Sequence, residues 1–313
     1  MPSLTYLVSR LIQIIPTFLI VMVFIFVLVR LLPGDPAIAM ADVKATAEQL
    51  DQIRQRLGLD QPMPVQFLRF VTSTLTGDLG TSTMLKQPVL DLVLSRLPAT
   101  AFLAVYAVIL SVLIAVPLAF IAALNRNRPI DIAIRAVFQV GLSTPVFYVG
   151  LILLSILAAR LRWFPVGGYG KSFAENLHML ALPALTVAFY TSAIILRNLR
   201  AAVIEVMDAE YVQFARAKGL PVMVVLGRHV LRNAMVSTVT LLGLSIGNLM
   251  SGTLVTETVF AVPGVGRLML DAIFGRDYPL IQGLTLTFAV LVSLVFLATD
   301  IVQAWLDPRL RRS

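Results

Sequence analysis

Gly243, Ser245 and Gly247 form a Gly-x-Ser-x-Gly pattern, which in hydrolases places a nucleophilic serine on a tight turn. That chemistry needs a turn between a strand and a helix, and a histidine that takes the serine proton. Here the pattern lies within a long apolar run, which predicts a membrane helix. Gly243, Gly247 and Ser251 also recur every four residues, a spacing typical of closely packed membrane helices. The sequence therefore favours helix packing over serine hydrolysis.

The segment Gly170-Lys171-Ser172 resembles the end of a phosphate-binding loop, whose backbone N–H groups cradle a nucleotide. The leading glycine of that motif would stand at position 165, which is Pro165. The distribution of basic residues also puts this segment outside the cell, away from cytoplasmic ATP. The chain thus has no recognisable cofactor site, so any ATP and magnesium are expected on a partner subunit.

A metal site or thiol chemistry is not expected either. His178 and His229 are far apart in sequence and fall on opposite sides of the predicted membrane. The chain has no cysteine, which excludes disulfides and thiol nucleophiles.

Polar side chains within the predicted membrane helices are candidates for lining a translocation path. We single out Ser143, Thr144, Ser245, Asn248 and Glu257. Glu257 lies at the outer end of its helix, so contact with an arginine or with water is the alternative to a functional role. For the hydroxyl and amide groups, the alternative is hydrogen bonding between helices, worth about 0.6–2 kcal/mol each. The predicted spans hold no series of carboxylates, which disfavours a proton-coupled carrier.

The composition indicates an integral membrane protein. Hydrophobic residues make up 58% of the 313 residues and charged residues only 13%, whereas ordinary soluble domains carry about 25% charged residues. The net charge of +8 is spread over several loops. Membrane topology and anionic lipid account for such a distribution better than a nucleic-acid partner does.

Six apolar runs are each long enough to cross a bilayer at about 1.5 Å per residue. They are Leu11–Leu32, Thr100–Leu124, Ala136–Ala159, Met179–Leu196, Met235–Val255 and Leu280–Ala298, the last extending toward Trp305. The first run exceeds the apolar core of a secretory signal, which has about 7–15 residues, so we expect an uncleaved anchor. These runs divide the chain into an anchor helix (1–32), an extracytoplasmic helical excursion (33–98), a five-helix core (99–306) and a basic tail (307–313).

The distribution of Lys and Arg predicts that both termini are cytoplasmic. The N-terminus, the 125–135 loop, the 197–234 loop and the tail together carry thirteen such residues, against five in the two short loops on the other side. The 33–98 excursion is too long to count under this rule. It includes a predicted capping box at Thr46–Gln49, with Gly58 as the helix stop.

The loop Asp208–Ala234 is a charged, helix-prone segment between two apolar spans. Its backbone must lie in water, because lipid offers no hydrogen-bond partners. Residues 211–218 read as a short helix that Gly219 ends, since glycine readily takes a positive φ, and Pro221 can open a second helix. Two short helices of this kind suit a docking element for a cytoplasmic partner; the alternative is an amphipathic linker lying on the membrane surface.

The run Ala215-Arg216-Ala217-Lys218-Gly219-Leu220, followed by His229-Val230-Leu231-Arg232-Asn233-Ala234, resembles the EAA loop of permeases in binding-protein-dependent ABC importers. In that family the motif begins Glu-Ala-Ala six residues before its glycine, where this chain has Gln213, Phe214 and Ala215. The usual Leu-Pro ending is also absent. The variant pattern resembles the dipeptide, oligopeptide and nickel permease branch.

Further motifs typical of that branch follow one another along the chain and point to its first, B-type, permease subunit. They are Leu31-Leu32-Pro33-Gly34-Asp35-Pro36, Leu57-Gly58-Leu59-Asp60-Gln61-Pro62, Gly77-Asp78-Leu79-Gly80, Arg96-Leu97-Pro98-Ala99-Thr100, Trp163-Phe164-Pro165, Thr256-Glu257-Thr258-Val259-Phe260, Arg276-Asp277-Tyr278-Pro279 and Asp307-Pro308-Arg309.

The resemblance implies an all-α integral membrane fold of the type I ABC importer permeases, with six transmembrane helices, in the bacterial inner membrane. It implies four kinds of partner: a second permease subunit, two cytoplasmic ATPases, an extracytoplasmic substrate-binding protein and the lipid membrane. ATP hydrolysis on the ATPases would be coupled to transport through the 208–234 loop. The expected contact residues are Tyr211, Gln213, Ala215, Arg216, Ala217, Lys218 and Gly219.

A secondary transporter that works alone is the alternative, and a membrane enzyme would need a catalytic constellation that the sequence lacks. A secondary transporter would need its own coupling-ion site and usually internal repeats, and neither is evident in the sequence. The solute stays open among dipeptides, longer peptides, nickel complexes and oligosaccharides, because specificity in the family rests largely with the binding protein.

Overall fold

The computed structural model describes residues 4–31, 46–58 and 60–306, without the side chains of some helical residues, 244–252 among them. The predicted tail 307–313 and most of the motif at 31–36 therefore lie outside the described residues. Within the described part, the regular structure is helical, beside one isolated antiparallel bridge between Thr81 and Pro88. The predicted all-α class is confirmed.

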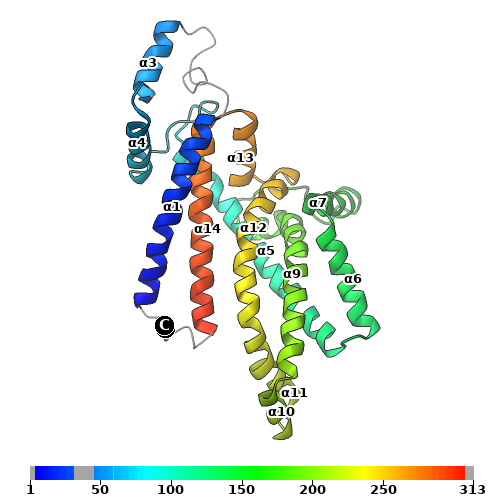
Figure 1. Cartoon of the computed structure of the whole chain (residues 1–313). Helices are drawn as coiled ribbons and strands as arrows, with labels where there is room; N and C mark the ends of the chain where they lie inside the picture. Colours follow the sequence, from blue (N-terminus) through cyan, green and yellow to red (C-terminus); the bar gives the residue numbers. More distant parts are fainter. Residues whose placement is uncertain (1–3, 32–45, 59, 307–313) are drawn as a thin grey trace.

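The long helices stand next to one another across the molecule (Figure 1). From one edge to the other they are α1 (Leu4–Leu31), α14 (Tyr278–Leu306), α12 (Arg232–Val259), α9 (Ala181–Met207) and α6 (Pro129–Ser143), and α5 (Val89–Leu124) runs obliquely across this row. The short helices α10 (Glu210–Ala217) and α11 (Val222–Val224) form a tip at one end, which we call the tip end. Helices α3 (Ala47–Leu57) and α4 (Met63–Leu75) lie at the opposite end.

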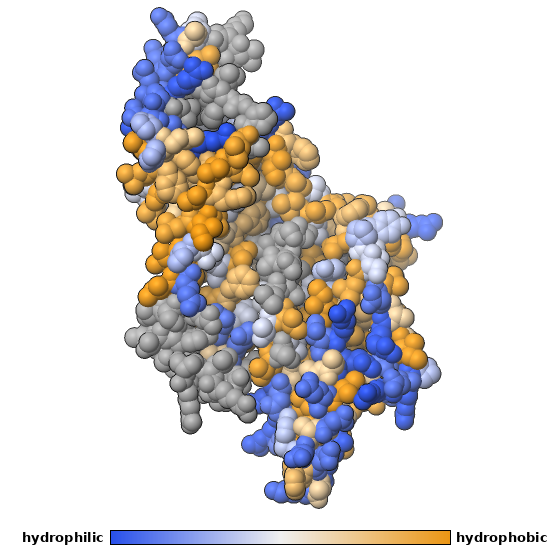
Figure 2. Space-filling view, viewed as in Figure 1, coloured by the Kyte–Doolittle hydropathy of each residue, from blue (hydrophilic) through white to orange (hydrophobic). Residues whose placement is uncertain are grey.

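Among the described residues, four helices are long and apolar enough to cross a membrane: α1, α5, α9 and α14. A fifth crossing is possible if α6 and the segment after it count as one broken span. Figure 2 shows the corresponding apolar surface on the upper part of the α1 and α14 side, with hydrophilic residues at both ends. The molecule is thus a multi-span membrane protein, and α12, with 28 residues, is also long enough to cross.

The second span starts earlier than the sequence predicted. We expected a helix from Thr100 and an excursion that runs to residue 98, but α5 begins at Val89. Pro98 lies inside this helix rather than before it, because membrane helices tolerate proline where neighbouring helices support the backbone. The added turns are buried through Val89, Leu92 and Val93, which pack against α13 (Val265–Phe274) and α14.

The third predicted span is not one helix. It consists of α6, then α7 (Val146–Leu153) and the π-helical segment η1 (Leu154–Arg160), and the two parts meet at 107°. Thr144 has an extended conformation with ψ of 132°, as expected for a residue before proline, because Pro145 disfavours the helical conformation there. The sequence contained this signal, but the length of the apolar run hid it.

Small residues let α5 and α9 approach closely. On α5, Leu103, Ala107, Ser111, Ala115 and Ala119 recur every four residues and are fully buried. The hydroxyl of Ser192 on α9 donates to the Ser111 backbone carbonyl at 3.3 Å. Packing of small residues with hydroxyl hydrogen bonds is the usual means of joining helices in lipid, where apolar surface alone gives little driving force.

Local signals in the excursion were read correctly. Thr46 caps α3, and its side chain and that of Gln49 form the predicted capping box. Gly58 ends the helix with a φ of 67°, the left-handed conformation that glycine accepts without strain. Gly243 also packs closely: a methyl group added there would clash with Thr299 on α14, which confirms helix packing at that glycine.

Candidate functional site

The tip is built by two short helices between α9 and α12. Helix α9 ends at Met207, and Ala209 precedes α10. Gly219 follows α10 with a φ of 73°, which confirms the predicted stop. Pro221 then opens α11, which continues into the π-helical segment η2 (Val225–Leu231) and so into α12. The tip is therefore connected to two long helices, α9 before it and α12 after it.

Helix α10 has one face toward the protein and one toward solvent. Val212 and Ala215 are buried, three residues apart on the same side of the helix. The solvent side carries Tyr211 and Phe214, with 46% and 68% of their area exposed. Gln213, Arg216, Ala217, Lys218 and Gly219 are exposed as well. Six of the seven predicted contact residues can thus be reached from outside, whereas Ala215 faces inward, where its small side chain allows close packing.

Apolar side chains continue on the solvent side of the next helix. Val222 and Met223 on α11 are 70% and 81% exposed. The tip in Figure 2 accordingly carries apolar patches among hydrophilic residues. Large apolar groups gathered on a solvent-exposed segment are typical of surfaces that bind another macromolecule. Arg216 and Lys218 give the same surface positive charge.

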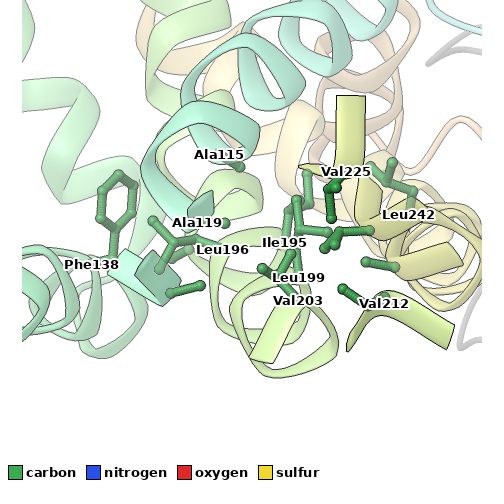
Figure 3. Close-up of a cluster of buried hydrophobic side chains, with 14 of the residues drawn as sticks. Ala115, Ala119, Phe138, Ile195, Leu196, Leu199, Val203, Val212, Val225 and Leu242 are labelled. Atoms are coloured by element: carbon green, nitrogen blue, oxygen red, sulfur yellow. The ribbon is translucent and has the colours of Figure 1, made fainter. Parts of the chain in front are cut away.

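The buried face of the tip belongs to the largest apolar cluster, which we call the tip cluster (Figure 3). Val212 and Ala215 from α10 and Val225 and Val230 from η2 meet side chains of α9, among them Leu199 and Val203. The cluster continues to Ala115 and Ala119 of α5, Phe138 of α6 and Leu242 of α12. A displacement of α10 must therefore disturb the packing of four long helices, because close-packed side chains transmit strain.

One polar contact fixes α10 to the start of α12. The amide nitrogen of Asn233 donates to the Tyr211 hydroxyl at 3.1 Å and to the carbonyl of His229 at 2.7 Å. Asn233 stood in the sequence motif, but its partner could not be inferred, because the two residues are 22 positions apart.

A buried ion pair joins α6 to α9 at the same end of the molecule. Asp131 is fully buried and accepts two hydrogen bonds from Arg200, each of 2.7 Å. It also accepts from Nε of Arg135 at 3.2 Å and from the backbone N–H of Asn127 at 2.9 Å. The sequence analysis missed this pair; the lone aspartate among the arginines of the 125–135 loop was the available signal.

The predicted path residues on the third span lie at its break. The hydroxyl of Ser143, which is exposed, donates to the carbonyl of Gln139 at 3.1 Å. Thr144 donates to the carbonyl of Val140 at 2.7 Å. Both groups are thus satisfied within their own helix and lie next to the 107° bend. The side chains of Ser245 and Asn248, on α12, lie outside the described residues.

Glu257 has a structural partner at the end opposite the tip. Its carboxylate is fully buried and accepts from the Thr100 hydroxyl at 2.7 Å and from the backbone N–H of Arg267 at 2.9 Å. The Thr100 hydroxyl in turn accepts from the backbone N–H of Val265 at 2.8 Å. Together these groups satisfy the first turn of α13, whose N–H groups have no partner within the helix. Both carboxylate oxygens of Glu257 thus have partners within this chain.

Asp277 accepts a hydrogen bond from the first turn of α14, and this role was not predicted from the sequence. This buried carboxylate accepts from the hydroxyl of Ser82 at 2.5 Å and from the backbone N–H groups of Thr83 and Met84 at 3.1 Å. It also accepts from the N–H of Leu280, in the first turn of α14, at 3.3 Å. An aspartate just before a helix that starts Tyr-Pro is a capping signal, but its contact with residues 82–84 is not visible in sequence.

Two other motifs have ordinary structural roles. Ser172 of the Gly-Lys-Ser segment caps the seven-residue helix α8 (Phe173–Met179), and its hydroxyl accepts from the N–H of Glu175 at 3.2 Å. The ring of His178 lies 5.7 Å from that of Phe164, measured between centroids. Within the described ranges, no group of three or more potential metal ligands gathers.

Comparison with protein-family models gives two matches that cover most of the chain. Residues 115–312 match the model described as "binding-protein-dependent transport system inner membrane component". Residues 3–104 match the N-terminal model of membrane components of the same transport systems.

Curated relatives match along their whole length. A protein of Salmonella paratyphi A named glutathione transport system permease protein GsiC is 39% identical over 308 residues, which cover 98% of this chain and 99% of that protein. A probable peptide ABC transporter permease protein, y4tP of Sinorhizobium fredii, is 39% identical over 309 residues, with the same coverage. The glutathione permease protein of Escherichia coli K12 is 37% identical over 308 residues.

Two solved structures share the fold. An inward-facing methionine ABC transporter, MetNI, aligns with a TM-score of 0.59 at 14% identity, over 69% of this chain and 96% of that chain. An amino acid ABC transporter solved with histidines aligns with a TM-score of 0.50 at 17% identity, over 70% of this chain and 94% of that chain.

Proposed function

Because the chain belongs to the family of inner membrane components of binding-protein-dependent transport systems and is the permease subunit of an ABC importer, we propose that it forms half of a translocation path for short peptides. The relatives named for glutathione and for peptides support this substrate class. The two-faced tip, which is exposed and apolar outside and packed into four long helices inside, is the observation that carries the mechanism.

The proposed topology has six spans with both termini in the cytoplasm. It counts α12 as a span and takes α6, α7 and η1 together as one broken span. The tip end then lies in the cytoplasm, where the basic residues of the 125–135 and 197–234 loops are concentrated. The excursion between the anchor helix and α5 lies on the other side, where a substrate-binding protein delivers its ligand.

The proposed partners are a second permease subunit, two cytoplasmic ATPases and an extracytoplasmic substrate-binding protein. ATP and magnesium are bound by the ATPases, so this chain acts as a transport component without catalysis of its own. The second permease supplies the other half of the path.

Coupling is proposed to run through α10. An ATPase contacts the exposed residues Tyr211, Gln213, Arg216, Ala217, Lys218 and Gly219, and the apolar groups of α11 beside them. When the ATPases close on ATP, α10 moves as a unit, and Val212 and Ala215 carry that motion into α9, α5 and α12. This is coupling between two-state elements through a packed contact.

For the path itself, Ser143 and Thr144 are proposed at the break between α6 and α7, with Ser245 and Asn248 on α12. Glu257, predicted as a fifth path residue, is instead proposed to hold the start of α13, because both of its oxygens already have partners.

The test is purification of the tagged chain from its native membrane in mild detergent, followed by mass spectrometry of the proteins retained. We expect a second permease and one or two ATPases. The chain alone, pure and able to transport after reconstitution, would contradict the proposal and favour a secondary transporter.

A further inference from the structure

A groove of about 550 Å³ lies between α6 and α9, near the tip end. Arg135, Arg197 and Arg200 line it together with apolar side chains, among them Phe138, Leu142 and Leu196. No acidic side chain is among the described residues that line it. The groove thus combines positive charge with an apolar floor.

The positive charge of the groove is only partly neutralised. Arg200 is engaged by the buried Asp131, and Arg135 shares the same carboxylate while 48% of its side chain stays exposed. Arg197 is exposed and has no hydrogen bond or ion pair with the described residues. Three guanidinium groups line the groove and one carboxylate pairs with two of them, which leaves an excess of two positive charges at an accessible site.

The polar and apolar parts of the groove lie at different depths. Helices α6 and α9 run in opposite directions, so Arg135 and Arg197 lie toward the tip, while Leu142 of α6 and Ala193 of α9 lie farther from it. The seven residues between Arg135 and Leu142 span about 10 Å at about 1.5 Å per residue. Figure 2 shows the hydrophilic residues gathered over the lower parts of α6 and α9.

We propose that this groove binds an anionic phospholipid of the cytoplasmic leaflet, with its phosphate between Arg135 and Arg197 and an acyl chain along Phe138 and Leu142. The order of the groups, cationic at the membrane surface and apolar inward, matches the two parts of a lipid, and basic pockets between membrane helices suit anionic headgroups. Exposed apolar residues of α6, Val137 and Val140, continue on the same helix. The inference rests on the proposed orientation of the tip toward the cytoplasm.

The lipid would contact the machinery of coupling. Phe138 and Leu196 line the groove and also belong to the tip cluster. An acyl chain that packs against Phe138 and Leu196 favours the arrangement of α6 and α9 in which the groove is open. Anionic lipid is therefore expected to stabilise one conformation of the importer.

The test uses the whole importer purified with its partners into nanodiscs of phosphatidylcholine that contain a minority of phosphatidylglycerol. Native mass spectrometry then counts the phosphatidylglycerol molecules that remain after release from the disc. Arg197→Gln and Arg135→Gln should each weaken retention about fivefold, because one basic residue near an anionic surface contributes about 1 kcal/mol. Arg126→Gln, in the neighbouring loop and outside the groove, removes the same charge and should leave retention unchanged.

Ala136→Trp gives a second test that keeps every charge, since its indole would fill the groove from α6. Retention of phosphatidylglycerol should fall in this variant too. Equal retention in wild type and all groove variants, or equal loss in Arg126→Gln, would overturn the proposal. A cross-link from a cysteine at 136 to the second permease would also overturn it, by showing that protein covers the groove. Recovery of the partner subunits in these samples reports on the proposed function separately.

Discussion

Two buried carboxylates hold together the end of the molecule opposite the tip. Glu257 satisfies the first turn of α13, and Asp277 satisfies that of α14 while it binds residues 82–84. Each joins segments far apart in sequence: Thr100 and Glu257 are 157 positions apart, and Ser82 and Asp277 are 195 apart. Each carboxylate thus fixes the start of a helix at the end of the molecule opposite the tip.

Glu257→Ala should loosen α13 selectively. The substitution leaves buried N–H groups of its first turn and the Thr100 hydroxyl without an acceptor, at about 1–3 kcal/mol for each unsatisfied group. Hydrogen exchange followed by mass spectrometry should show faster exchange in residues 265–274 of the purified importer. Glu205→Ala, at an exposed site on α9, should change nothing there.

The same experiment distinguishes the two roles considered for this residue. If Glu257 acted on the substrate in the path, uptake would fall in Glu257→Ala while exchange in α13 stayed as in wild type. That result would contradict the structural role.

At the scale of the element, α10 has one face that is exposed to a partner and one face that packs against the helix bundle. It has only eight residues, too few to be a stable helix alone. Its stability comes from Val212 and Ala215 in the tip cluster, so the helix and the bundle must move together.

Val212→Ala should destabilise the tip by about 1–2 kcal/mol, through the loss of buried apolar surface. Hydrogen exchange in residues 210–231 should accelerate, and less substrate should be taken up per ATP hydrolysed. The matched change Val222→Ala, at a side chain that is 70% exposed, should leave exchange in this segment as in wild type. Identical exchange in the two variants would show that the tip does not depend on the cluster.

Some elements of the fold could be predicted from the sequence, and others could not. The short helix before Gly219, the capping box at Thr46 and the all-α class follow from local patterns, and the structure confirms each. The start of α5 was predicted at Thr100, but the helix begins at Val89, because its first turns pack against α13 and α14, which the sequence does not place beside it. The break at Thr144 has a local signal, yet the uninterrupted apolar run outweighed it.

The candidate site also has features that could be predicted from the sequence and features that could not. The expected docking residues come from a motif, and most of them are exposed, but the inward direction of Ala215 depends on how α10 meets α9. The pairs Asp131–Arg200 and Thr100–Glu257 join distant segments. Local patterns in a single sequence do not show which distant residues come into contact, so these pairs were missed.

At the scale of the whole molecule, the orientation in the membrane decides which partner meets which end. The chain has no cysteine, so a single introduced cysteine gives one labelling site. In cells with a permeable outer membrane, an impermeant maleimide should label Lys171→Cys directly. Arg126→Cys should be labelled only after the inner membrane is opened. The opposite pattern would reverse the topology and remove the tip from the ATPases.

We propose that the tip couples ATP hydrolysis to transport, and a substitution at Gly219 tests this coupling most directly. Its φ of 73° is strained for any side chain, although a Cβ there would meet no atom within 4 Å. Gly219→Val therefore acts through backbone strain of about 1–3 kcal/mol. Gly227→Val is the matched control, because Gly227 has equal space and no positive φ.

The measurement is peptide uptake per ATP hydrolysed by the importer reconstituted in proteoliposomes with its binding protein. For Gly219→Val we expect the chain to insert and ATP hydrolysis to continue, while uptake per ATP falls at least about fivefold. Gly227→Val should resemble wild type. Normal uptake per ATP in Gly219→Val would contradict coupling through the tip.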